Sequence, residues 1–267
     1  MKHDGDRSGG PGTGVRLGWG PGGAHRLVGG AACLVVVDVL SFTTAVSVAV
    51  EKGIRVLPFW WPGGTATDVD RARATEAAAG YARRSGARAA AHRHDVTPAT
   101  PWSLSPAQLC AAPFVARLVL PSPNGATIAA AAPAQVRVVA ACLRNSAAVA
   151  TRLVSLGYGT PERPVAVIAA GERWPDGSPR PAVEDLLGAG ALVSAMSARG
   201  TGPLSPEAAA AEEAYEGTAD LAHAIATSTS GRQLAASGFA EDVAIACETN
   251  TCAHVPTRAG DGAFGPG

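Results

Sequence analysis

The sequence predicts an α/β fold, a three-layer α/β/α sandwich around a mostly parallel sheet, with a mixed sheet as the alternative. Strand-like and helix-like segments alternate along the chain from residue 34 to about residue 170. The strand-like runs at 34–37 and 165–170 are short and continuously apolar, which is typical of strands buried on both faces. Helix start and stop signals lie between such runs, so we expect parallel strands joined by crossover helices.

The alternation defines the elements in order. Strands are expected at 34–37, 54–59, 117–120, 136–141, 165–170 and 243–246. Helices are expected at 43–52, 70–85, 126–132, 146–156, 183–198, 206–214 and 218–228, and a further helix starts at Ser105-Pro106. Ser41 or Thr43 is expected to cap the first helix, Gly53 to end it, and Asn145 to cap the helix at 146–156.

Composition bounds the class of protein. The 267 residues are 47% apolar and 16% charged, and the 22 basic residues equal the 22 acidic ones. Nucleic-acid and membrane-surface binding usually show as an excess of basic residues, and this chain has none. No apolar run approaches the roughly 20 residues of a spanning helix, and the start of the chain does not read as a signal peptide. Five cysteines, an odd number without a CxxC spacing, favour a reduced, cytoplasmic chain.

The domain organisation is expected to be simple. Residues 25–257 read as one α/β domain, between a Gly-rich flexible tail at 1–24 and a second tail at 258–267. Within the domain, residues 86–104 show no clear period. The Ala-rich helices near the C-terminus offer a surface for an oligomer, whose formation the sequence leaves open.

Asp38 is the sharpest candidate for function. It ends the apolar run CLVVVDV, and a carboxylate at the end of a buried strand is costly unless it is paired, hydrogen-bonded or bound to a cation. One interpretation makes it a divalent-metal ligand or a nucleophile, and the other makes it a cap for the helix that starts near Thr43. Leu40 excludes the haloacid dehalogenase pattern, which needs a second Asp at that position.

Further polar residues follow other strands or start a helix. Asn124-Gly125 allows close approach of a ligand, but it is also an ordinary turn sequence. Glu184 and Asp185 suit the positive end of a helix dipole, and either one could complete a metal site with Asp38. Glu172-Arg173 follows a strand, where Arg173 could pair with an anion. For His92-Arg93-His94, a surface position is favoured over a metal site.

Taken in order, these motifs resemble the 2-phosphosulfolactate phosphatase family, hydrolases placed in coenzyme M biosynthesis. The matching segments are VVVDVLSFTTAV (35–46), LPSPNGATI (120–128), CLRNSAAVA (142–150), IAAGE (168–172), VEDLLGAGAL (183–192) and EDVAIACE (241–248). The resemblance implies a three-layer fold, a magnesium ion, and hydrolysis of a phosphomonoester that is a small phosphorylated acid.

The resemblance also implies roles for residues. Those implied as catalytic are Asp38, Asn124, Glu184 and Asp185. The implied magnesium ligands are Asp38, Glu184 and Asp185, and the resemblance leaves open which residue holds the metal and which activates water. The expected substrate contacts are Ser41, Thr43, Thr44, Gly125, Asn145, Glu172 and Arg173, with backbone N–H groups near Thr43, Thr44 and Gly125 on the phosphoryl oxygens.

Two segments depart from the family pattern. Ser41-Phe42 stands where the family usually has Arg-Ala after Asp-Val-Leu, which removes a guanidinium clamp for phosphate or sulfonate. AAAHRHDV and SLSPAQL replace an Ala-Gly-Glu-Arg motif and a Gly-Asn-Ser-Pro-like turn. The alternatives are therefore a phosphatase for a different small phosphorylated acid, or a non-catalytic anion-binding or regulatory protein on the same fold.

Overall fold

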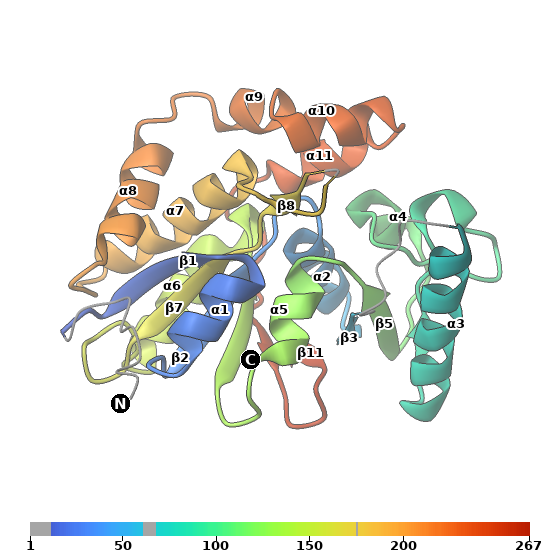
Figure 1. Cartoon of the computed structure of the whole chain (residues 1–267), viewed down its shortest axis with the longest axis horizontal. Coiled ribbons are helices and arrows are strands. Elements are labelled where there is room, and N and C mark those ends of the chain that lie inside the picture. The colour runs from blue at the N-terminus through green and yellow to red at the C-terminus, as the bar shows by residue number, and fades with distance from the viewer. Residues whose placement is uncertain (1–11, 61–67, 175) are drawn as a thin grey trace.

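The computed structural model describes residues 12–60, 68–174 and 176–267. Within these ranges the chain forms a nine-stranded sheet in the order β1-β7-β2-β6-β10-β11-β3-β5-β4, with helices against it (Figure 1). Its strands are β1 (Val15–Trp19), β2 (Cys33–Val37), β3 (Arg55–Phe59), β4 (Arg88–Ala89), β5 (Arg117–Pro121), β6 (Arg137–Ala141), β7 (Val165–Ala169), β10 (Pro256–Arg258) and β11 (Phe264–Pro266). The predicted α/β class with a mostly parallel sheet is confirmed.

The sheet consists of two parallel halves. In the half β1-β7-β2-β6 every pairing is parallel, as it is in the half β3-β5-β4. The antiparallel hairpin β10–β11 joins them through single pairings, Thr257 with Val139 and Phe264 with Val56. The sheet is therefore mixed, the alternative that the sequence had left open.

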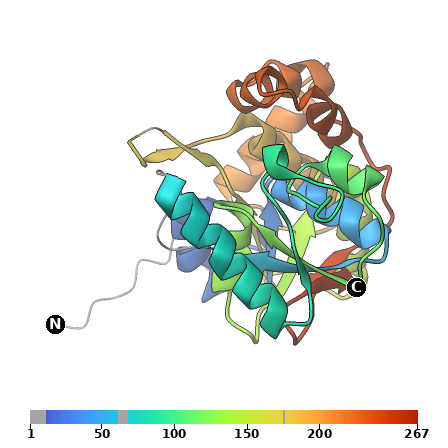
Figure 2. The same ribbon diagram turned by 90° about the vertical axis from the view of Figure 1, so that its right-hand side faces the viewer.

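The helices flank this sheet. They are α1 (Gly20–Val28), α2 (Phe42–Glu51), α3 (Asp68–Arg84), α4 (Pro106–Ala111), α5 (Gly125–Ala131), α6 (Ser146–Ser155), α7 (Val183–Ser197), α8 (Pro206–Glu216), α9 (Leu221–Ala226), α10 (Thr229–Ala236) and α11 (Ala240–Ala246). Figure 1 and Figure 2 show α9, α10 and α11 gathered at one end of the molecule. Short 3-10 turns lie at η1 (Arg93–Asp95) and η2 (Leu143–Asn145), and a small antiparallel ribbon joins β8 (Glu172–Arg173) to β9 (Pro179–Arg180).

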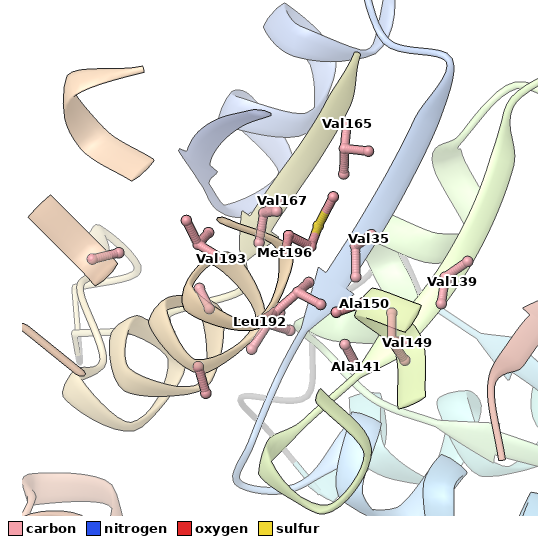
Figure 3. Packing of buried hydrophobic residues seen from close by; sticks show 14 of the residues in the cluster. Val35, Val139, Ala141, Val149, Ala150, Val165, Val167, Leu192, Val193 and Met196 are labelled. Carbon is pink, nitrogen blue, oxygen red and sulfur yellow. The ribbon is translucent and has the colours of Figure 1, made fainter. Parts of the chain in front are cut away.

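The core explains the apolar runs. In β2, Val35 packs in one cluster with residues of α6 and α7, while Val36 packs in another with residues of α1 and α2. Figure 3 shows the first cluster, where Leu192 and Met196 of α7 lie close to the strands. Burying each such side chain contributes about 1.5–3 kcal/mol. A strand covered on both faces has no polar side to alternate, so its sequence is continuously apolar.

Small residues set the packing of α7. A Cβ atom on Gly190 would lie 2.1 Å from the carbonyl oxygen of Ala211 in α8, and one on Gly188 would lie 2.6 Å from Cγ2 of Val39. The Gly-Ala-Gly sequence of α7 therefore lets it approach α8 on one side and the end of β2 on another.

Three expectations need correction. The tail predicted at 1–24 is wrong for residues 15–24, which form β1 and begin α1, while residues 1–11 lie outside the described ranges. The tail predicted at 258–267 is wrong because Phe264 and its neighbours form β11 in the middle of the sheet. The strand predicted at 243–246 is the second half of α11, since a short apolar run fits a helix as well as a strand.

Two further properties of the described ranges concern the apolar character of the helices and the oxidation state of the cysteines. None of those helices combines the length and the apolar character needed to cross a membrane. The five cysteines are free thiols.

Candidate active site

Asp38 lies just past β2 with both carboxylate oxygens engaged. Its Oδ1 atom accepts a 3.2 Å hydrogen bond from the amide of Phe42, and Oδ2 accepts a 2.7 Å bond from the amide of Gly125. The side chain therefore caps the start of α2, as the capping interpretation predicted, and it also binds the first amide of α5. A carboxylate oxygen has a second lone pair, so these bonds leave room for a ligand.

Asp38 also reaches a cavity of about 600 Å³ at this end of the sheet. Two acidic and three basic side chains share its wall with hydroxyl, amide and apolar groups. The wall comprises Asp38, Leu40, Ser41, Arg93, Leu104, Ser122, Pro123, Asn124, Glu172, Arg173, Trp174, Arg180, Thr229, Ser230, Gln233, Leu234 and Ser237. The cavity thus brings together the predicted residues Asp38, Ser41, Asn124, Glu172 and Arg173.

The carboxyl groups here are electrostatically unusual. Burial, and then the charge of Glu172, raises the pKa of Asp38 from 3.8 to about 7, although the amides of Gly125 and Phe42 oppose the rise. Burial also raises the pKa of Glu172, opposed first by a hydrogen bond from Asn124. Buried carboxylates that repel one another are stabilised in their ionised form by a bound cation or a nearby guanidinium.

Asp185 lies outside the cavity wall and links the turns that follow β2 and β7. Its Oδ1 atom accepts a 2.7 Å bond from the amide of Val39, and Oδ2 accepts a 2.8 Å bond from the amide of Gly171. Burial and the neighbouring Asp38 raise its pKa well above the usual range. Because Asp185 ties the ends of β2 and β7 and is absent from the cavity wall, its geometry suits positioning.

Glu184 occupies the first turn of α7 beside Asp185. It is buried and absent from the cavity wall, and its charge contributes to the raised pKa of Asp38. Among the described residues, no three His, Cys, Asp or Glu side chains form a group that could hold a metal ion by itself. The carboxylates that do face the cavity are Asp38 and Glu172.

Three of the predicted substrate contacts lie outside the cavity wall. Thr43 and Thr44 are fully buried, and their hydroxyls donate to the carbonyl oxygens of Asp38 and Val39 at 2.8 Å each. Asn145 is fully buried, accepts a 2.9 Å bond from the amide of Cys142 and donates to Ala140, which fixes the turn after β6. These side chains shape the turns and do not line the cavity.

Two of the three amides expected at the phosphoryl group are used within the protein. The Gly125 N–H donates to Asp38, and the Thr43 N–H donates to the Asp38 carbonyl oxygen at 2.9 Å. Neither group is therefore free to bind a phosphoryl oxygen in the way that the sequence suggested.

The sequence interpretation missed Arg93. Its Nη2 atom donates a 2.6 Å hydrogen bond to the Oγ atom of Ser41, so a guanidinium lies beside the position where the sequence suggested that a clamp was lost. The segment around it has no regular period. The absent arginine at position 41, and the arginine of the Ala-Gly-Glu-Arg motif that this segment replaces, were the signals that could have found it. Its neighbour His94 is exposed and packs edge-on against Phe239 at 4.9 Å.

The ribbon β8–β9 and α10 form another wall that sequence reasoning did not assemble. Arg180 donates a 3.2 Å hydrogen bond to the Oγ atom of Ser230 in α10 and lies 5.5 Å from the ring centroid of Trp174. A second guanidinium is thereby held at the cavity by a hydroxyl and an aromatic ring.

A comparison with known protein families identifies the family to which this chain belongs. The family model described as 2-phosphosulpholactate phosphatase matches residues 24–261, nearly the whole chain. The chain belongs to the 2-phosphosulpholactate phosphatase family. This is a phosphatase family, whose members are phosphoric monoester hydrolases. No individually curated protein is significantly similar to the chain.

The match places the cavity within the part of the chain that the 2-phosphosulpholactate phosphatase family defines. Asp38, Arg93, Glu172 and Arg180 all fall between residues 24 and 261, as does Asp242 of α11. The observed cavity, with its carboxylates and guanidinium groups, is therefore the candidate active site of this phosphatase family member.

Proposed function

We propose that this chain hydrolyses a small phosphorylated acid of the 2-phosphosulfolactate type, with magnesium as its cofactor. The observation that carries the proposal is the meeting of Asp38 and Glu172 with Arg93 and Arg180 around one cavity. Guanidinium groups bind phosphoryl, carboxylate and sulfonate oxygens, and carboxylates hold a hard cation. A phosphorylated acid with its metal ion needs both kinds of group.

The donor set fits magnesium. Mg²⁺ is bound in proteins by one or two carboxylates together with water and phosphate oxygens. Asp38 and Glu172 would supply the carboxylates, with the Asn124 side chain beside them in the wall. Magnesium in this position would neutralise phosphoryl oxygens and lower the pKa of a coordinated water. The family resemblance also implied Glu184 and Asp185 as ligands, and the magnesium affinity of Asp185→Asn tests the second of these.

The remaining roles follow from position. The amides of Phe42 and Gly125 fix the Asp38 carboxylate, which can then act on a ligand without a rotamer change. Asn124 shares the cavity wall with Glu172, and its side-chain amide opposes the rise in the pKa of that carboxyl. Arg180 and Arg173 are placed to bind an acidic group of the ligand at the ribbon β8–β9.

The test is phosphate release from 2-phosphosulfolactate and from a panel of small phosphorylated acids, with magnesium and then with EDTA. We expect turnover that needs magnesium and that falls at least about a hundredfold in Asp38→Asn, as when one electrostatic stabiliser is removed. Asp261→Asn, an exposed carboxylate in a surface ion pair, is the matched control. Full turnover in EDTA, or in a folded Asp38→Asn variant, would contradict the proposal.

The same assay separates the alternatives. Turnover of a panel member in preference to 2-phosphosulfolactate would identify a phosphatase for another small phosphorylated acid. Binding of panel members without phosphate release at any magnesium concentration would indicate a non-catalytic binding protein.

A further inference from the structure

One guanidinium reaches the cavity from a loop that is remote in sequence from Asp38 and Ser41. Arg93 begins the turn η1, between β4 and α4, and stands in the cavity wall with Asp38 and Ser41. Ser41 is separated from Arg93 by 52 residues, so tertiary structure alone brings the two side chains together.

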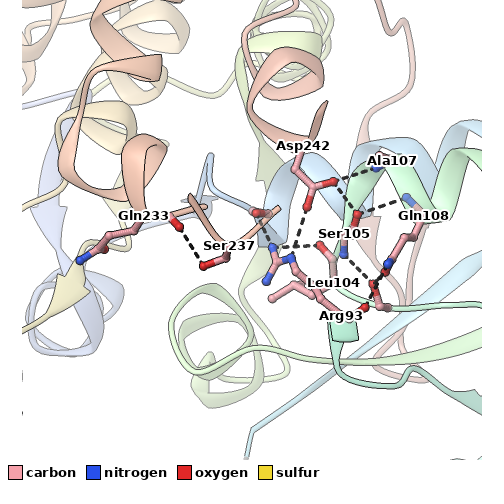
Figure 4. A network of polar contacts seen from close by, with 10 residues as sticks. Arg93, Leu104, Ser105, Ala107, Gln108, Gln233, Ser237 and Asp242 are labelled. Atoms are coloured by element: carbon pink, nitrogen blue, oxygen red, sulfur yellow. Dashed lines mark hydrogen bonds and ion pairs between the residues drawn. The ribbon is translucent and has the colours of Figure 1, made fainter. Parts of the chain in front are cut away.

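The orientation of this guanidinium is fixed from behind by a buried carboxylate. Asp242 in α11 is fully buried, and its Oδ2 atom accepts a 3.2 Å ion-pair hydrogen bond from Nε of Arg93. The Oδ1 atom of Asp242 accepts bonds from the hydroxyl of Ser105 at 2.5 Å and from the amide of Ala107 at 3.1 Å. Figure 4 shows this network, in which the first turn of α4 holds Asp242 and Asp242 holds Arg93.

Further contacts hold the rest of the guanidinium. The Nη2 atom donates to Ser41 at 2.6 Å and to the carbonyl oxygen of Leu104 at 3.4 Å, and the group lies 5.6 Å from the ring centroid of Phe239. Ser41 is buried at the cavity wall, and its hydroxyl accepts the hydrogen bond from Arg93. A guanidinium held in one plane presents its remaining donors in a fixed direction, as recognition of an oxyanion requires.

Donors of Arg93 remain for a ligand. Among the described residues the hydrogen bonds of the Arg93 side chain use Nε and Nη2 and leave Nη1 without one, and the side chain is 20% exposed. Arginine has five N–H donors, so the bonds to Asp242, Ser41 and Leu104 do not use all of them. The unused donors belong to a group that already lines the cavity.

We propose that Arg93 is an oxyanion-binding residue of the cavity that Asp38 lines, and that Asp242 is its positioning residue. The inference deepens the proposed function because it names the group that contacts the ligand, but it requires only that an oxyanion binds. A phosphoryl group and a carboxylate or sulfonate share the chemistry that Arg93 recognises.

The test measures binding, independently of turnover. Titration calorimetry with inorganic phosphate, methanesulfonate and acetate, each with and without magnesium, compares the wild-type chain with Arg93→Ala and Arg93→Lys. We expect Arg93→Ala to weaken binding of the preferred anion about tenfold to a hundredfold, as for loss of a hydrogen bond to a charged group. Arg93→Lys restores only part of the affinity, because lysine keeps the charge without the planar fork.

Two further variants separate positioning from folding. Asp242→Asn is expected to weaken anion binding while Arg93 is still present, and methylguanidinium added to Arg93→Ala is expected to restore part of the binding. Ser41→Ala removes one acceptor of Arg93 and is expected to weaken binding a few-fold, which tests positioning even if Asp242→Asn does not fold. The matched control is the surface ion pair between Arg117 and Asp261, 2.8 Å apart, tested as Arg117→Ala and Asp261→Asn.

The outcomes are distinct. Equal binding by wild type and a folded Arg93→Ala, or no binding of any of the three anions by wild type, overturns the inference. Equal binding by wild type and both Ser41→Ala and a folded Asp242→Asn overturns the positioning role. Arg93-dependent binding in a chain that releases no phosphate from any substrate sustains the inference while the proposed function fails.

Discussion

The amide of Gly125 donates a 2.7 Å hydrogen bond to the Oδ2 atom of Asp38, across 87 residues of sequence. This bond joins the start of α5 to the end of β2 at the cavity. It requires a residue without a side chain, because a Cβ atom on Gly125 would lie 2.7 Å from that same oxygen and 2.6 Å from Cδ1 of Phe42. The Asp38 side chain therefore leaves no space for a Cβ atom at this turn, so the residue must be glycine.

Gly125→Ala should damage both stability and activity. The added methyl group must displace Asp38 or Phe42, and overpacking of this kind costs about 1–3 kcal/mol. Urea unfolding would measure the loss, and turnover should fall because the carboxylate moves. Gly29→Ala is the matched control, since φ is −64° there and a Cβ atom would meet open space. Unchanged stability and turnover in Gly125→Ala would show that the turn relaxes freely.

The raised pKa of Asp38 predicts a pH-dependent stability. The carboxyl titrates near 3.8 in the unfolded chain and at about 7 in the folded one, so between these values the folded state binds more protons. Stability is thus highest at low pH with respect to this group and falls as pH rises from about 4 to 7. One pKa unit corresponds to about 1.4 kcal/mol, so the loss is up to about 4 kcal/mol in metal-free protein.

Denaturant titrations of metal-free wild type and Asp38→Asn from pH 4 to 8 measure this effect. The variant should show a shallower fall with pH, because the group that titrates has been removed. Identical slopes for the two proteins would mean that Asp38 has an ordinary pKa.

Asp185→Asn separates a positioning role from a metal-binding one. Asparagine has one side-chain oxygen, so it cannot accept from both Val39 and Gly171. A buried amide left without an acceptor costs about 1–3 kcal/mol, which thermal unfolding would detect. Calorimetric magnesium affinity should fall more in Glu172→Gln than in Asp185→Asn. The reverse order would restore Asp185 as the metal ligand implied by the family resemblance.

Sequence predicted the strands that carry the site because their burial leaves a local signature. The run ending at Asp38 is apolar at every position, since β2 has helices on both faces. The hairpin β10–β11 carries no such signature. Each of its strands has three residues, and their place in the sheet depends on pairing with Val139 and Val56, far away in the chain.

Residues of the candidate site could be predicted where a side chain directly follows a strand. They could not be predicted where contacts between segments remote in sequence hold the side chain at the cavity. Asp38, Asn124 and Glu172 directly follow strands or lie one turn beyond them, so their motifs placed them at the cavity. Arg93 is held by Asp242, which is 149 residues away. Thr43 and Asn145 lie outside the cavity wall, and the sequence could not show this because turn residues that bond strand carbonyls have the same sequence pattern as residues that bind a ligand.

Arg144→Lys should lower stability without changing catalysis. Arg144 follows β6 and is buried, with 7% of its surface exposed. Its guanidinium forms ion pairs with Glu51 at 3.0 Å and Glu248 at 2.9 Å, and it donates a hydrogen bond to the hydroxyl of Ser47. Lysine cannot reproduce this fork, so we expect a loss of about 1–2 kcal/mol in urea unfolding. Turnover per folded molecule should stay at the wild-type value, because Arg144 is absent from the cavity wall. The exposed Arg152→Lys is the control for a neutral exchange. A fall in kcat for Arg144→Lys at full folding would place this arginine in the site after all.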